Sequence, residues 1–235
     1  MNRYSPLPER QFILFPYEVD DTSATLTNFA TITKSYPHTA SYLLENKKRL
    51  EEREQGRFKG INWHRFGRNQ NIGIQGRVKV CVPRLIDKLY ATYDVSGKHF
   101  LDNVDVGGIT LKDEYQSQGL IYLLGLLNSG LSRWYFPHIS APFRGGWMSA
   151  NRQFLSQLPI RPINFDDPAD AARHARMVAL VEQMLTLHTR QAAARADDRA
   201  LFARQIAATD QQIDALVYEL YGLNEEEVET VSGLG

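Results

Sequence analysis

The last third of the sequence carries apolar residues at helical spacing, and this pattern limits the possible folds more than any other feature. Asp167 is placed to cap a helix, and Pro168 stands at its first position, where the missing N–H of proline costs nothing. The apolar stripe that follows consists of Met177, Leu180, Met184 and Leu187, broadened by Val178, Val181 and Leu185. A helix that runs from there to about Gln205 would be roughly 50–60 Å long at 1.5 Å per residue, which predicts an arm and not a core element.

Two further helices are predicted after this one. The first of them carries the apolar residues Ile206, Ile213, Leu216, Val217 and Leu220. Gly222 is expected to end it, and Asn224 to cap a short acidic helix that begins at Glu225. The stripe of the long helix is broad and is interrupted by Gln191 and Asp198, so we do not expect a coiled coil. A helical hairpin that folds back on itself or on a partner is the better interpretation.

The first two thirds of the chain read as short strands and short helices separated by Gly- and Pro-containing turns. Strands are predicted at residues 12–15, 25–33, 78–82, 90–95, 100–106 and 109–111. Helices are predicted at residues 39–54, 115–127, 131–136 and 151–157, the first of them burying Tyr42, Leu43 and Leu50. The expected fold class is therefore α+β, a mixed or antiparallel sheet of short strands with packed helices, followed by long C-terminal helices. We place one domain at 1–165 and a helical C-terminal arm, a spacer or a partner-docking element, at 166–235.

Charge is distributed unevenly along a chain whose formal net charge is zero. Residues 47–88 contain twelve Lys and Arg against four Asp and Glu, whereas residues 165–235 contain six against thirteen. This division predicts a basic surface in the first part of the chain and a separate acidic, helical tail. The acidic tail would repel phosphate and is not expected to touch nucleic acid.

The segment 56–77 is rich in Gly, Arg and Asn and has no steady periodicity, so it is predicted to be a loop. Positive charge for phosphate contacts comes from Arg57, Lys59, Arg65, Arg68, Arg77 and Lys79. Side chains of the types that hydrogen-bond guanine or adenine edges are Arg65, Arg68, Asn69, Gln70, Asn71 and Gln75. Trp63 and Phe66 either anchor this loop in a core or stack at the edge of a groove. The competing interpretation is a solvated loop with packed aromatic rings; we favour contact with DNA.

A second candidate edge lies at residues 141–151. The paired Gly145 and Gly146 allow the backbone to approach another surface closely, and Arg144, Trp147 and Asn151 stand beside them. A tight turn that positions the following helix is an equally good interpretation. The basic run 47–49 is different, because Glu51, Glu52 and Glu54 follow it at helical spacing, and we interpret it as a solvated helix face.

Motifs for catalysis are missing from the sequence. It contains no glycine-rich phosphate loop, no dinucleotide-binding fingerprint and no nucleophile elbow. The tetrapeptide of adenine methyltransferases (Asn or Asp, two prolines, an aromatic residue) is also absent. Cys81 is the only cysteine and the six histidines are scattered without ligand spacing, so neither a metal site nor a catalytic residue is predicted. The sequence has no long apolar run and no apolar stretch near the N-terminus. We therefore expect a cytoplasmic location and no association with a membrane.

Several segments, in order, resemble one known family. The stretch YLLGLLNSGLSRWYFPHIS followed by FRGGWMSANRQFLSQLPI is similar to the TaqI-like C-terminal specificity domain. Upstream, YPHTASYLLENKKRLEER followed by the basic loop and KVCVPRL also follows that family, and IDALVYELYGLNEEE resembles its helical ending. The resemblance covers about residues 10–228. In this family the domain follows the catalytic part of type II and type IIG restriction–modification proteins that methylate adenine.

The resemblance implies that residues 1–165 form a DNA target-recognition domain that reads double-stranded DNA and positions a target adenine for a catalytic domain absent from this chain. It implies a methyltransferase, and possibly a nuclease, as a linked domain or partner subunit. S-adenosylmethionine would bind to that catalytic part, with no cofactor on this chain. Removal of residues 166–235 is then expected to spare DNA contact and to impair docking. Two alternatives stay open: half of a type I restriction specificity subunit, and a helical scaffold protein that does not bind DNA.

Overall fold

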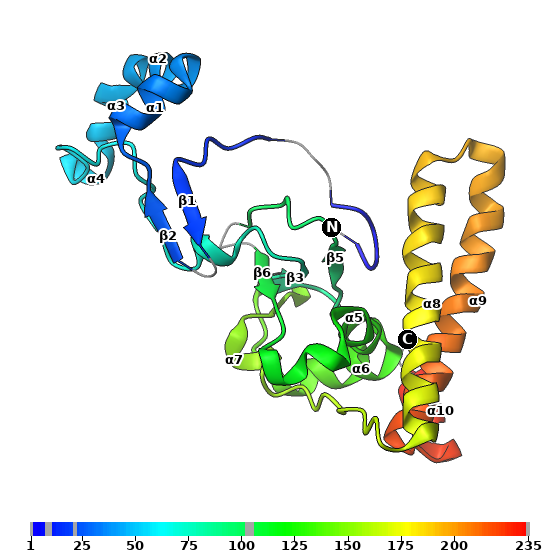
Figure 1. Cartoon of the computed structure of the whole chain (residues 1–235). Helices are drawn as coiled ribbons and strands as arrows, with labels where there is room; N and C mark the ends of the chain where they lie inside the picture. Colours follow the sequence, from blue (N-terminus) through cyan, green and yellow to red (C-terminus); the bar gives the residue numbers. More distant parts are fainter. Residues whose placement is uncertain (1, 8–10, 21–22, 102–105, 234–235) are drawn as a thin grey trace. The chain divides into compact units, whose positions relative to one another are not determined.

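The computed structural model describes residues 2–7, 11–20, 23–101 and 106–233 of the chain. These residues form two compact units, a small unit at Pro8–Gly76 and a large unit that combines Met1–Leu7 with Arg77–Gly235 (Figure 1). Both contain helices and short antiparallel strands, so the predicted α+β class is confirmed.

The small unit pairs a two-stranded sheet with four short helices. Its elements are β1 (Tyr17–Asp20), β2 (Ser23–Leu26), α1 (Phe29–Ser35), α2 (Pro37–Glu45), α3 (Lys47–Glu51), α4 (Arg53–Gly56) and the 3₁₀ helix η1 (Ile72–Ile74). The two strands are antiparallel. The core of this unit is formed by Ile32, Ala40, Leu43 and Trp63, with Phe29 and Leu50 packed against it.

Three predictions for the small unit were wrong. Residues 12–15 form no strand: the ladder of β1 and β2 ends at the pair of Tyr17 and Leu26, no described strand continues alongside residues 12–15, and Phe12 is 96% exposed. The predicted strand 25–33 is divided because the Asn28 side chain accepts the Ala30 N–H at 2.8 Å and starts helix α1. The predicted helix 39–54 is three short helices, and Tyr42 points to solvent.

The large unit contains two small antiparallel sheets. The first has the order β5-β3-β6, with β3 at Lys79–Pro83, β5 at Thr92–Asp94 and β6 at Val106–Ile109. The second pairs β4 (Leu85–Ile86) with β7 (Met148–Ser149). The predicted strands 78–82 and 90–95 are thus confirmed within a residue or two. Of the predicted strand 100–106, residues 102–105 lie outside the described residues, and of 109–111 only Ile109 is in a strand.

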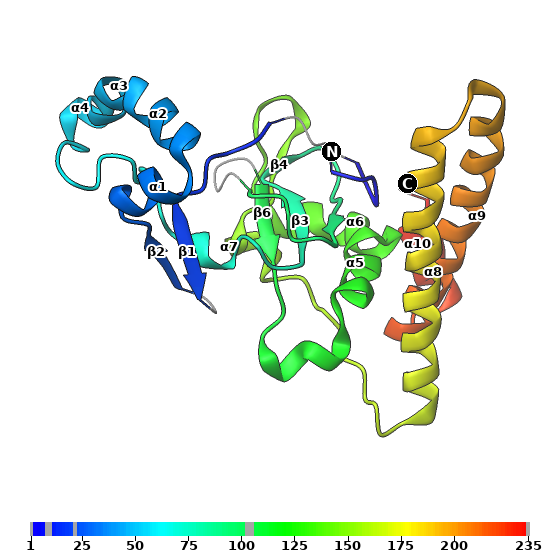
Figure 2. The same cartoon turned by 45° about the horizontal axis from the view of Figure 1, so that its top comes forward.

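Helices complete the large unit, and one of them, α5 (Leu120–Asn128), packs against β3 and β5 of the first sheet (Figure 2). The others are η2 (Asp113–Gln118), α6 (Gly130–Ile139), η3 (Arg144–Gly146), α7 (Arg152–Leu155), α8 (Pro168–Ala193), α9 (Ala196–Tyr221) and α10 (Glu225–Ser232). The predicted helix 115–127 is interrupted because Gly119, at φ +74°, separates a 3₁₀ turn from α5. The caps at Asp167 and Asn224 and the left-handed Gly222 after α9 are confirmed.

The C-terminal helices form a hairpin, as predicted, but they are not an arm outside the core. The long helix ends at Ala193 and not near Gln205, and α8 and α9 lie side by side (Figure 1). Their inner residues Met177, Val181, Met184, Ile213, Leu216 and Val217 belong to the same apolar core as Val80, Ile86, Leu124 and Leu126. Gly125 of α5 lets α8 approach, since a Cβ there would lie 2.7 Å from the sulfur of Met177.

The N-terminal residues are also part of the large unit. Tyr4 is fully buried in its core, and its N–H donates to the carbonyl of Ala91 at 3.2 Å. Arg3 pairs with Asp210 of α9, and the Thr92 hydroxyl donates to the carbonyl of Ser5. The compact units therefore divide at Gly76, whereas the sequence suggested a boundary at residue 165; the functional division at 165 stays a prediction.

Truncation after residue 165 tests this arrangement. Because α8 and α9 supply a large part of the core, the shortened chain is expected to lose the cooperative unfolding transition of the large unit, in contrast to the intact domain expected from sequence. Thermal unfolding followed by circular dichroism measures this. Truncation after Leu223, which removes only α10, is the control and should retain a cooperative transition. An intact transition after truncation at 165 would contradict this description of the core.

Candidate nucleic-acid interface

The basic loop, defined as residues 57–76, leaves the helices of the small unit through a run of left-handed backbone. Glu54, Gln55 and Gly56 have φ values of +46°, +62° and +84°, and Gly60 has +112°. Glycine adopts such angles without steric cost, and the two non-glycine residues require support from their surroundings. The loop therefore begins as a tightly turned segment.

Arg53 of α4 holds the loop against this turn. Its guanidinium donates to the carbonyl oxygens of Leu50 at 2.8 Å, Trp63 at 3.1 Å and Arg65 at 2.9 Å. It also lies over the ring of the buried Phe58, 4.3 Å from the centroid, and Arg65 lies 5.1 Å from the same centroid. Sequence reasoning counted Arg53 only as one more charge, because nothing in the pattern marks an arginine whose partners are backbone carbonyls.

Aromatic rings fix the loop from the inside. Trp63 is only 4% exposed and packs 5.0 Å from the ring of Phe29. Phe66 packs 5.2 Å from Tyr17, whose hydroxyl accepts the Phe66 N–H at 2.8 Å. Of the two roles that the sequence left open for these rings, the structure supports the anchor. Trp63 is therefore corrected from a direct DNA contact to a buried support.

Most of the exposed side chains of the basic loop are cationic or carry amides, and Ile61 is exposed as well. Exposed residues of the loop include Arg57, Lys59, Arg65, Arg68, Asn69, Gln70 and Asn71. Arg57 pairs with Glu54 at 3.2 Å, yet its side chain is mostly exposed. Gln75 is buried and cannot read a base edge. Lys79 is buried in β3 and pairs with Asp94 at 2.7 Å, so its predicted phosphate contact was wrong.

The remaining predicted residues, Arg77, Arg144, Trp147 and Asn151, belong to the large unit. Arg77, Arg144 and Trp147 are exposed. Asn151 is half-buried, and its carboxamide oxygen accepts the Gln153 N–H at 2.9 Å as the cap of α7. Its other amide atom donates to Ser149 Oγ at 3.2 Å, so this side chain is used within the fold.

Comparison with known proteins identifies the family. The family model of the TaqI-like C-terminal specificity domain matches residues 26–160, which is more than half of the chain. The chain belongs to this family. The match begins at the end of β2 and continues to Ile160, so the specificity domain includes both the basic loop and the hairpin around Arg144. The family prediction made from the sequence is confirmed.

One curated relative is similar to this chain over nearly the whole length of the chain. It is the Type II restriction enzyme and methyltransferase RM.Eco57I of Escherichia coli, 20% identical over 239 residues. The alignment covers 98% of this chain and 24% of that protein. The chain thus spans about a quarter of the length of this relative.

The basic face of α3 is adjacent in sequence to the loop. Lys47 lies 5.6 Å over the Trp63 ring and pairs with Glu51 at 3.8 Å, in agreement with a solvated helix face. Lys48 and Arg49 are exposed, and no ion pair within the described residues holds them. The predicted neutralisation of this run therefore applies to Lys47 alone.

The described residues offer neither a metal-ligand cluster nor an accessible thiol. No three His, Cys, Asp or Glu side chains among them are placed to hold a metal ion. Burial raises the pKa of Cys81 to about 12, so this thiol stays protonated at neutral pH and is a poor nucleophile. No described helix is long and apolar enough to span a bilayer.

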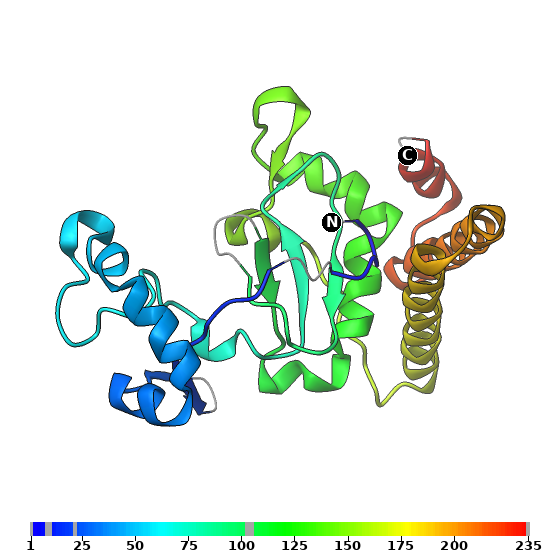
Figure 3. The same ribbon diagram turned by 90° about the horizontal axis from the view of Figure 1, so that it is seen from above.

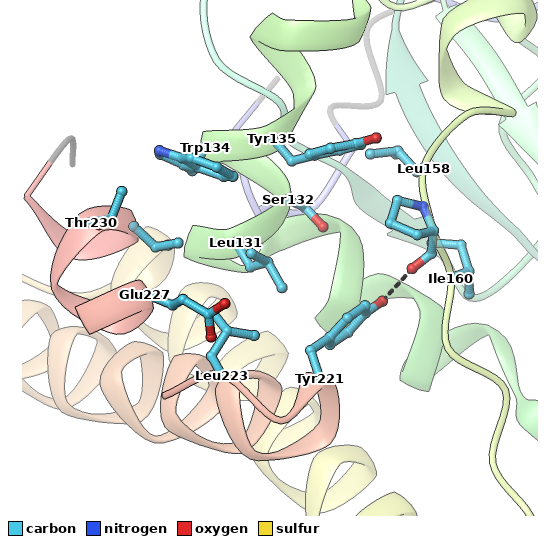
Figure 4. Close-up of a pocket in the computed structure, with 12 residues that line it drawn as sticks. Leu131, Ser132, Trp134, Tyr135, Leu158, Ile160, Tyr221, Leu223, Glu227 and Thr230 are labelled. Carbon is cyan, nitrogen blue, oxygen red and sulfur yellow. Dashed lines mark hydrogen bonds between the residues drawn. The ribbon is translucent and has the colours of Figure 1, made fainter. Parts of the chain in front are cut away.

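A pocket of about 310 Å³ lies between α6, the segment at Leu158–Ile160 and the helices α9 and α10 (Figure 4). Leu131, Tyr135 and Leu223 supply apolar surface. The Tyr221 hydroxyl on its wall donates to the carbonyl of Pro159 at 2.6 Å, and the Glu227 carboxylate accepts the Asn224 N–H at 2.9 Å. These polar groups are already used in the fold, so the pocket offers mainly apolar contacts.

Arg53 gives a direct test of how the loop is held. Arg53→Met removes the donors to three carbonyl oxygens, and we expect it to lower the free energy of local unfolding of residues 57–66 by about 2–3 kcal/mol. Hydrogen exchange followed by mass spectrometry measures this segment separately from the large unit. Arg57→Met, which removes an exposed arginine with one ion pair, is the matched control. Equal protection in both variants would contradict the role of Arg53.

Proposed function

We propose that this chain recognises a sequence in double-stranded DNA and positions a target adenine for methylation by a catalytic domain or subunit. The observation that carries the proposal is the basic loop: a segment fixed by Arg53 and by aromatic rings that exposes arginines and amides. From residue 55 to residue 86 the chain contains no Asp or Glu, so no acidic side chain within the loop opposes phosphate. Membership in a specificity-domain family supports the same conclusion.

The side chains of the loop divide into two roles. Arg57 and Lys59 are placed near the start of the loop and are assigned to phosphates, which set the register on the duplex. Arg65 and Arg68 suit the two acceptors of guanine, and amides such as Asn69 suit the donor and acceptor of adenine. The other two amides, Gln70 and Asn71, are assigned the same role. In the large unit, Arg77 and Arg144 are assigned to phosphates.

The methyl transfer itself is assigned to another part of the enzyme. RM.Eco57I is named as a restriction enzyme and methyltransferase in one protein, which supports a methyltransferase, and possibly a nuclease, as the linked domain or partner here. S-adenosylmethionine would bind there. A methyltransferase must rotate its base out of the helix, and the grip of a specificity domain offsets the cost of unstacking. Such a system would act in the cytoplasm, where the chromosome lies.

Binding of the full chain to a random 30-bp duplex, measured by fluorescence anisotropy across salt, tests the proposal. The four cations assigned to phosphates, Arg57, Lys59, Arg77 and Arg144, predict a slope of log K against log salt of about −3.6, which is roughly a 100-fold loss between 50 and 200 mM. A single-stranded oligonucleotide of the same length is the comparison and should bind more weakly. Absence of salt-dependent binding would refute the proposal and favour a scaffold protein.

A further inference from the structure

The large unit presents a narrow loop whose tip is aromatic. We call residues 140–150 the aromatic hairpin; it projects from the sheet in Figure 3. Its stem is closed by hydrogen bonds from the Ser149 N–H to the Ala141 carbonyl at 3.2 Å and from the Phe143 N–H to the Trp147 carbonyl at 2.6 Å. β7 pairs with β4, and the Ala150 N–H donates to the carbonyl of Arg84 at 2.8 Å, so the base of the hairpin is fixed in the sheet.

The tip holds two large rings in solvent. Phe143 is 59% exposed and Trp147 is 45% exposed, on either side of Arg144, Gly145 and Gly146. Both glycines have positive φ, +74° and +81°, and this turn places the rings on the two strands of the stem. Exposed rings of this size are unfavourable in water, so a short closed loop that holds them outward indicates a binding surface.

The charged residues near the hairpin in sequence indicate which kind of partner would bind it. Residues 115–165 contain no Asp or Glu and four arginines. Arg133 and Arg161 are neutralised by Asp214 and Asp170. Arg144 and Arg152 are exposed, and among the described residues no ion pair holds either of them. Aromatic rings beside unneutralised arginines, without acids, are complementary to stacked bases between phosphates.

We infer that the aromatic hairpin is a wedge that inserts Phe143 or Trp147 into the base stack of duplex DNA while Arg144 contacts the backbone. The inference rests on the proposed function and adds to it a residue, Phe143, that sequence reasoning missed. Apolar side chains that insert between base steps are a common way to kink or open a duplex. A ring that fills a gap in the stack would also stabilise DNA from which a base has been rotated out.

The test compares a 30-bp duplex that contains a central abasic site with the same duplex intact, because a gap in the stack removes the cost of insertion. The full-length protein is expected to bind the abasic duplex at least roughly fivefold more tightly, the lower range for stacking one base on an aromatic ring. The double variant Phe143→Ala/Trp147→Ala should bind both duplexes equally, with an unchanged salt slope. Fluorescence of 2-aminopurine beside the gap should fall with the original protein and not with the variant.

Tyr115→Ala/Phe165→Ala is the matched control, since both rings are exposed to a similar degree, 47% and 42%, and lie outside the hairpin. This variant should keep the preference for the abasic duplex. Salt-dependent binding without any such preference, or a preference that survives in the hairpin variant, would overturn the wedge and leave the proposed function standing. Unchanged DNA binding with weaker association to a methyltransferase domain would overturn it in favour of protein docking. Failure to bind either duplex would refute the proposed function itself.

Discussion

Replacement of Arg65 and Arg68 by alanine should reduce affinity for duplex DNA at least roughly 100-fold at 100 mM salt, without unfolding the small unit. Each arginine is expected to make a charge-assisted contact, and two such contacts contribute about 3–6 kcal/mol together. Both side chains are exposed, and the main structural loss is the position of Arg65 over the Phe58 ring. Anisotropy against a selected target sequence and against random duplex measures the loss of affinity and of sequence preference.

The control variant removes the same charge from another surface. Arg176 and Arg190 are exposed on α8, and Arg176→Ala/Arg190→Ala should leave binding within about twofold. Arg65→Lys/Arg68→Lys separates charge from geometry, because lysine keeps the charge and loses the two-pronged contact to guanine. That variant should keep affinity for random duplex and lose sequence preference. Unchanged binding by the alanine variant would remove the basic loop from the interface.

Replacement of Lys79 by methionine should lower the free energy of unfolding of the large unit by about 3–5 kcal/mol, the usual cost of leaving one partner of a buried ion pair alone. The side chains of Lys79 and Asp94 are 3% and 0% exposed, and Lys79 Nζ lies 2.7 Å from Asp94 Oδ2. The backbone N–H of His99 donates to Asp94 Oδ2 at 3.1 Å, and His99 Nδ1 lies 3.0 Å from Asp94 Oδ1. Urea unfolding of the full chain measures the change.

Two controls decide between charge and packing. Lys98→Met, an exposed lysine in the same region, should change stability by less than about 0.5 kcal/mol. The double variant Lys79→Met/Asp94→Asn removes both charges and should recover part of the loss, since a buried pair replaced as a whole costs less than one that is broken. A double variant no more stable than Lys79→Met would show that lost packing, and not the uncompensated charge of Asp94, causes the loss.

The same carboxylate predicts a pH dependence. Burial by itself would raise the pKa of Asp94, but the hydrogen bonds from Lys79 and His99 and the charge of Lys79 outweigh it and hold this pKa below its ordinary value of 3.8. A carboxyl whose folded pKa is depressed stabilises the fold above its unfolded pKa and loses this contribution as pH falls through the folded pKa. Stability of the large unit should therefore decrease below about pH 4, and less steeply in Lys79→Met.

Local sequence signals were most successful where one or two side chains decide the structure. The helix ends predicted from Asp167 with Pro168, from Gly222 and from Asn224 are all present in the structure. Local signals gave wrong predictions where the structure of a segment depends on a partner distant in the sequence. Residues 12–15 are an example, since they are apolar but pair with no described strand. The candidate site shows the same division. Exposed Arg65 and Arg68 followed from composition, whereas the burial of Trp63 and Lys79 did not.

The sequence alone determined the fold class, the family, the basic segment and the helical hairpin at the C-terminus, because each depends on residue types and spacings within one stretch of chain. Only the tertiary structure decided that this hairpin is part of the core, that Arg53 organises the loop and that Phe143 is held in solvent. Each of these depends on which residues, distant along the chain, share a surface. An apolar helix face or an arginine has the same local pattern whether its partner is water, a carbonyl or a second helix.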